Sequence, residues 1–174
     1  QSPQLPTLRI SDLCTKFSGT IILEPRSSTW ALMPKDISLN MPFARWDNPG
    51  NLIHRKQWEL TNLAMKLVKP EDEARHQLLD RALHSDQYWW ASAKPWWSME
   101  MIERGAYELL TAIRGFQHST AEDKQKAWDL YIEIITTGFE WQRNGTVANL
   151  SRQEDEEMRE RMEQDQPYIS PAEY

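Results

Sequence analysis

The chain has 174 residues, a length that one hydrophobic core can stabilise, so we expect a single domain. Its net charge of -6 argues against binding a nucleic-acid backbone, and the absence of a long uncharged apolar run excludes a membrane-spanning helix. One cysteine and four scattered histidines exclude an internal disulfide and a Cys/His zinc site. We therefore expect an acidic cytoplasmic protein with no metal and no cofactor.

Residues 1–50 hold six of the ten prolines, which excludes a long helix in this region. We predict an extended N-terminal arm or linker that contributes at most one or two short strands. The best candidate strand is the β-branched run at 19–23.

The loop at 43–51 combines an aromatic residue, a cation and an acid immediately before a helical pattern. Loops of this kind often carry function, so Trp46 is a candidate ligand-contacting residue. The alternative is an Asx-type turn in which Asp47 or Asn51 caps the helix and Trp46 packs against it.

Residues 51–150 show apolar positions that recur every three or four residues, the spacing of amphipathic helices. We predict a mainly α fold in which this segment forms a helical bundle of four or five helices. The expected helices are 52–68, 71–83, a third region from 86 to 114 that bends or breaks at Pro95, and 119–143.

Residues 151–174 begin with a strongly acidic stretch, in which seven acids and three arginines occur between 151 and 166. Only Met158 and Met162 offer apolar surface there. We predict an acidic C-terminal helix or tail exposed to solvent, and the alternative is an interaction tail.

The densest motif of the chain is an aromatic segment at 84–97, where four of the nine tryptophans fall within nine residues. Adjacent helical residues point about 100° apart, so both members of each Trp pair cannot easily face the core. Exposed rings beside Asp86 suit a sugar, whose C–H groups stack on an aromatic face while its hydroxyls form hydrogen bonds. The alternative is an aromatic core at a helix junction.

Catalytic signals are weak in comparison. Ser85 neighbours His84 in sequence, but neighbours on a helix diverge and do not form a nucleophile–base pair. Glycoside hydrolysis needs two carboxylates that flank the bond, and no spacing in this chain selects such a pair. We therefore do not expect the isolated chain to be active as an enzyme.

Two segments carry a resemblance to a known family. Residues 78–90 read LLDRALHSDQYWW, and residues 43–51 read FARWDNPGN before a helix that begins IHRKQWEL at 53. Together with Gly105-Ala106-Tyr107, they resemble the helical region that follows the catalytic barrel in family fifty-seven glycoside hydrolases, which include α-amylases and glucanotransferases. The resemblance covers roughly residues 40–115.

This resemblance implies an enzyme that processes α-glucans and whose catalytic domain lies upstream in the same polypeptide, so we expect this chain to be a piece of a longer one. Asp86, Trp89 and Trp90 match positions that approach the glucan in that family. Our leading hypothesis is a helical accessory region that contributes Asp86, Trp89, Trp90 and Trp46 to a sugar-binding cleft. The alternative is a non-enzymatic helical interaction module with a Trp-rich core or interface.

Overall fold

The structure is a computed structural model that describes residues 7–17, 19, 23–25, 27–69, 73–94 and 96–163. Its helices are α1 (Ile10–Lys16), α2 (Pro34–Ser38), α3 (Leu52–Leu67), α4 (Glu73–Ala82), α5 (Asp86–Ala91), α6 (Met99–Gly115), α7 (Ala121–Arg143) and α8 (Thr146–Glu163). No strand occurs in these described ranges. The candidate strand at 19–23 lies largely outside the described residues.

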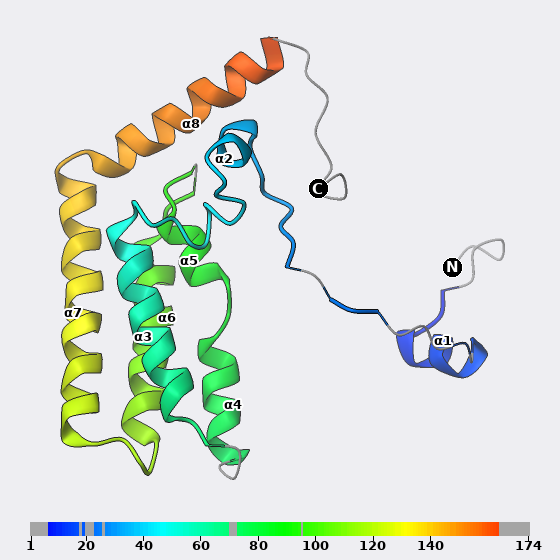
Figure 1. The fold of residues 1–174 in the computed structure, drawn as a ribbon, viewed down its shortest axis with the longest axis vertical. Coiled ribbons are helices and arrows are strands. Elements are labelled where there is room, and N and C mark those ends of the chain that lie inside the picture. The colour runs from blue at the N-terminus through cyan, green and yellow to red at the C-terminus, as the bar shows by residue number, and fades with distance from the viewer. Residues whose placement is uncertain are drawn as a thin grey trace.

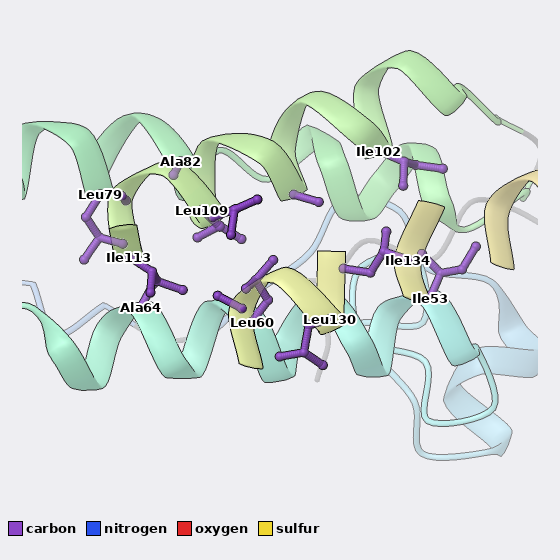
Figure 2. Close-up of a cluster of buried hydrophobic side chains, with 14 of the residues drawn as sticks. Ile53, Leu60, Ala64, Leu79, Ala82, Ile102, Leu109, Ile113, Leu130 and Ile134 are labelled. Carbon is purple, nitrogen blue, oxygen red and sulfur yellow. The ribbon is translucent and has the colours of Figure 1, made fainter. Parts of the chain in front are cut away.

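Five of these helices, α3 to α7, form a bundle with α6 at its centre, in contact with each of the other four (Figure 1). Aliphatic residues from α3, α4, α6 and α7 fill the space between them, and Figure 2 shows their side chains meeting in one cluster. The predicted mainly α fold with a bundle of four or five helices is confirmed. The described residues contain more helices than that because α1, α2 and α8 lie outside the bundle.

Local capping signals set the ends of α7 close to the predicted positions. The Thr120 hydroxyl accepts a hydrogen bond from the main-chain N–H of Asp123 (3.1 Å), and the main-chain N–H of Thr120 donates to the Asp123 carboxylate (3.0 Å). This reciprocal pair is a capping box. The helix ends before Gly145, whose φ of +82° is easily adopted only by a residue without a side chain.

The third predicted helical region is broken into two separate helices, one of the two outcomes that the sequence predicted. Residue Ala93 has a φ of +54°, a left-handed conformation that interrupts the backbone after α5. The next helix, α6, begins anew with Ser98 as its N-cap, whose hydroxyl accepts from the main-chain N–H of Met101 (3.3 Å).

The N-terminal arm contains two short helices that the proline pattern did not predict. Residues of α1 are all exposed, whereas α2 begins at Pro34, the position in a helix where proline is best tolerated. Helix α8 crosses the end of the bundle near α2 (Figure 1). No described helix is both long and apolar enough to cross a lipid bilayer.

Buried charges hold α8 in place, so the expected solvent-exposed acidic helix is wrong at one position. Glu154 is only 4% exposed and forms an ion pair with the guanidinium of Arg45. The other side of that guanidinium contacts the Asp36 carboxylate of α2 (2.9 Å). An exposed pair, Lys35 with Glu157, lies alongside.

Candidate functional site

The aromatic segment is centred on α5, a helix of six residues that is too short to be stable without tertiary contacts. Gln87, Tyr88 and Ala91 are buried. Because successive side chains diverge by about 100°, the remaining positions point away from that buried face. Asp86 is exposed, and Trp89 and Trp90 are half-buried, as expected for a helix with one side open.

Polar side chains from the N-cap and the first turns of α3 hold α5 by its main-chain oxygens. Three nitrogen atoms contact three of these oxygens, each at 2.9 Å: Asn51 Nδ2 to Ala91 O, His54 Nε2 to Tyr88 O, and Gln57 Nε2 to Gln87 O. These three side chains are themselves buried. The position of α5 is therefore fixed by directional bonds, and sequence reasoning identified Asn51 only as a possible cap and not the other two.

His54 is held in its neutral form. Its Nδ1 accepts from the main-chain N–H of Asn48 (3.1 Å), so Nε2 carries the proton and donates to Tyr88 O. Burial lowers the pKa of His54 to about 4, and the hydrogen bond to Tyr88 opposes this only in part. Asn51 also caps α3, because its side chain accepts from the main-chain N–H of His54 (3.0 Å).

Three tryptophans from distant segments form one aromatic cluster, which we call the Trp platform: Trp30, Trp46 and Trp89. The ring centroids of Trp89 lie 5.0 Å from Trp30 and 5.2 Å from Trp46. Trp30 and Trp46 meet edge to face at 6.1 Å. Trp30 is 68% exposed, so the platform opens to solvent. The indole N–H of Trp58 donates to Trp46 O (3.0 Å) and fixes the turn that carries Trp46.

The structure brings two of the four predicted site residues together and places the other two elsewhere. Trp46 and Trp89 share the Trp platform. Trp90 packs against the core and makes an edge contact with Trp96 at 6.0 Å. Asp86 lines a separate hollow. Trp30 was missed, because a single Trp in a proline-rich arm gives no local signal of its position.

The hollow at Asp86 has a volume of about 590 Å³ and lies between α4, α5 and α6; its lining residues are Arg81, His84, Asp86, Met101, Arg104 and Glu108. Glu108 contacts Arg104 Nε (3.2 Å) and lies 3.6 Å from His84 Nε2. The side chains of Arg81 and Asp86 form no hydrogen bond or ion pair with the described residues. The hollow therefore offers both donors and acceptors, close to neutral in total charge.

Arg45 directly precedes Trp46 and holds in place the turn that carries Trp46. It is buried between Asp36 and Glu154, which come from α2 and α8. Burial raises the pKa of the Glu154 carboxyl, and the charge of Arg45 opposes this only in part. One oxygen of that carboxyl, Oε2, is buried and has no hydrogen-bond partner among the described residues.

Comparisons of the chain with protein-family models, with curated proteins and with solved structures find no match. Within the described ranges, no three acidic, histidine or cysteine side chains are grouped as metal ligands would be. A functional proposal for this chain therefore depends on the geometry around α5 and on the resemblance of its aromatic segment.

Proposed function

We propose that this chain is a helical accessory region of a carbohydrate-active enzyme and that the surface around α5 forms part of its sugar-binding cleft. The observation that carries the proposal is the Trp platform. Its three rings are neither fully buried nor scattered, and they meet at one solvent-exposed place next to α5, which three buried polar side chains hold by hydrogen bonds. A sugar ring stacks its C–H face on such a surface.

The hollow at Asp86 supplies the hydrogen bonds that stacking alone lacks. Asp86 and Arg81 have acceptor and donor groups that no described side chain occupies, and sugar hydroxyls can both donate and accept. A mixed, nearly neutral lining favours an uncharged polyhydroxy ligand over a strong anion. Asp86 and Trp89 belong to the same short helix, so one extended oligosaccharide that lies across α5 can contact both.

The substrate that we propose is an α-glucan, and the catalytic carboxylates belong to an upstream domain of the same polypeptide. Both parts follow from the resemblance to family fifty-seven glycoside hydrolases. Under this proposal the isolated chain binds sugar without hydrolysing it. The acidic composition and single cysteine are consistent with a cytoplasmic location, which we include in the proposal.

The second candidate function is a protein-interaction module, and a specific observation favours it. Trp96 is 51% exposed and packs against Trp90 on a different side of α5 from the platform. Exposed aromatic residues are common at protein interfaces. This function predicts no affinity for any oligosaccharide.

Titration with maltooligosaccharides separates the two functions. We expect saturable binding to the wild-type chain by calorimetry, and roughly a fivefold or greater loss for Trp89→Ala, since an aromatic stacking contact contributes about 1 kcal/mol. Asp86→Asn keeps the shape of the side chain but removes charge-assisted hydrogen bonds, so we expect weaker binding with an unchanged Tm. Tyr107→Ala removes an exposed aromatic residue of α6 that lies outside the Trp platform and serves as the control. No binding by a folded wild-type chain would rule out the sugar-binding function.

A further inference from the structure

Helix α7 has apolar residues on two faces. The inner face consists of Ala127, Leu130, Ile134 and Gly138, all buried in the bundle. A second set lies about a third of a turn away, at about 100° per residue, and we call it the outer stripe: Trp128, Ile132, Ile135 and Phe139. A surface helix normally has a polar outer face, so this stripe needs an explanation.

The described chain covers the outer stripe only in part: the Arg114 guanidinium lies 5.0 Å from the Trp128 ring centroid, and Ile135 packs on one side against the core. Trp128, Ile132 and Phe139 are 37%, 38% and 45% exposed, and Ile135 between them is half-buried. Figure 1 shows α7 along one edge of the bundle, with α3 and α6 on its inner side and no element beyond it. The stripe extends over three turns, about 16 Å of helix. Contiguous exposed apolar surface of this kind marks an interaction site.

The spacing of the stripe is the same in both directions. Its members are separated by four, three and four residues, so the pattern is unchanged when the helix is reversed. If a second α7 packs antiparallel against the first, Ile132 faces Ile135 of the second copy, and Trp128 faces Phe139. A two-fold symmetric interface requires such self-complementarity, because each copy uses the same surface.

Charges beside the stripe fit the same antiparallel arrangement. In a helix pair, the residues that flank the apolar seam determine orientation. In this register Glu122, near the N-terminal end of the stripe, lies on one flank next to Arg143 of the second copy. The two-fold symmetry repeats the same pair at the other end of the stripe. Neither side chain forms an ion pair with the described residues. Asp129 on the same flank faces the uncharged Thr136.

We propose that the chain forms a two-fold symmetric dimer in which the outer stripes of two antiparallel α7 helices pack together and Glu122 of each copy pairs with Arg143 of the other. The ends of the stripe have room for this contact. A shallow hollow of about 290 Å³, lined by Glu140, Arg143 and Asn144, lies where Glu122 of the second copy arrives. Helix α5 lies on the other side of the bundle, so the dimer leaves the Trp platform accessible (Figure 1).

Sedimentation equilibrium tests the dimer directly. At about 100 µM, which exceeds the dissociation constants typical of specific interfaces, we expect a mass twice the 20.5 kDa of one chain. Ile132→Glu buries an unpaired charge at the centre of the seam and should raise the dissociation constant at least about tenfold. Met65→Glu, at an exposed apolar position on α3 outside the stripe, is the control and should leave the dimer intact. Circular dichroism confirms that both variants are folded.

A charge exchange tests the orientation. Arg143→Glu places two glutamates together at each end of an antiparallel pair and should weaken the dimer. The double variant Glu122→Arg with Arg143→Glu restores opposite charges and should recover the wild-type dissociation constant, whereas in a parallel pair each position meets its own copy and no recovery occurs. A monomeric wild-type chain, a dimer that Ile132→Glu leaves unchanged, or failure of the double variant to recover would each overturn the proposal.

Discussion

Gly105 of α6 lies directly against Gln87 of α5. A Cβ atom on Gly105 would fall 2.4 Å from the Gln87 Cβ, closer than two carbon atoms approach without a shift of the backbone. Gln87 cannot swing away easily, because it is fully buried and its Nε2 donates to Ala82 O (2.8 Å). The glycine therefore permits α5, and with it Trp89, to lie close to the centre of the bundle.

The first prediction follows from this contact. Gly105→Ala should lower the free energy of unfolding by about 1–3 kcal/mol, the cost of overpacking a dense core, even though alanine is the better helix former. For a chain of this size, this corresponds to a fall in Tm of about 2–4 °C per kcal/mol. Thermal unfolding monitored by circular dichroism measures the change.

Gly115→Ala is the matched control for this prediction. It lies in the same helix, and its nearest neighbour atom would be 4.0 Å away, an ordinary contact distance. We expect it to be neutral or to stabilise by up to about 1 kcal/mol. Equal effects of the two substitutions would show that the close contact with Gln87 does not limit stability.

The second prediction concerns Trp30, the most exposed ring of the platform. Because most of this ring contacts water, Trp30→Ala should change the free energy of unfolding by less than about 1 kcal/mol. If the platform binds sugar, the same change should weaken maltooligosaccharide binding about fivefold, and Trp30→Phe should retain most of the affinity. Affinity that falls for Trp89→Ala but not for Trp30→Ala would restrict the binding surface to Trp46 and Trp89.

Features that depend on contacts between residues close in sequence could be predicted, and features that depend on contacts between distant segments could not. The start and end of α7 could be predicted, because Thr120, Asp123 and Gly145 act through contacts within a few residues. The interruption between α5 and α6 was also predicted, from Pro95, but the left-handed conformation of Ala93 has no compositional signature.

The site itself depends on contacts between distant segments. Arg45 and Glu154 are 109 positions apart, and Trp30 reaches Trp89 only after the arm has folded back over the bundle. Periodicity describes which face of a helix is buried but not which segment covers it. Sequence therefore indicated that Trp89 and Trp90 must diverge and could not indicate that Trp30 would join one of them.

The third prediction is a loss of stability in mild acid caused by His54. Its pKa is about 4 in the folded chain and ordinarily 6.5, so the unfolded state binds a proton more readily. The contribution of neutral His54 is complete above pH 6.5 and is lost as the pH falls towards 4. The total is roughly 3 kcal/mol, with a slope near 1.4 kcal/mol per pH unit inside that window.

Urea unfolding at several pH values between 4 and 7.5 measures this dependence. His54→Gln should be less stable at neutral pH, because it does not reproduce both ring hydrogen bonds, but its stability should fall less steeply with acid. The difference in slope between wild type and variant isolates His54 from the other titrating groups. Parallel curves for the two proteins would show that His54 does not resist protonation in the folded chain.

The fourth prediction concerns the buried Arg45, which lies between two carboxylates and leaves an excess negative charge. The pKa of Glu154 is raised above its ordinary 4.5, so the folded state binds this proton more readily than the unfolded state. The ionised form is therefore unfavourable at neutral pH, and the penalty is relieved as the pH falls through the raised pKa towards 4.5. This dependence has the opposite sign to that of His54.

Glu154→Gln should consequently stabilise the chain at pH 7 by up to about 1 kcal/mol, since the amide can still accept from Arg45 while Asp36 remains as its counter-ion. Arg45→Met should do the reverse and cost about 3–5 kcal/mol, because it leaves two buried carboxylates without a cation. Glu157→Gln, which removes only the exposed pair with Lys35, is the control and should change stability by less than about 1 kcal/mol. Urea unfolding at pH 7 compares the three variants. If Glu154→Gln destabilises the chain as strongly as Arg45→Met, the ionised Glu154 carboxylate stabilises the cluster at pH 7 and the prediction is wrong.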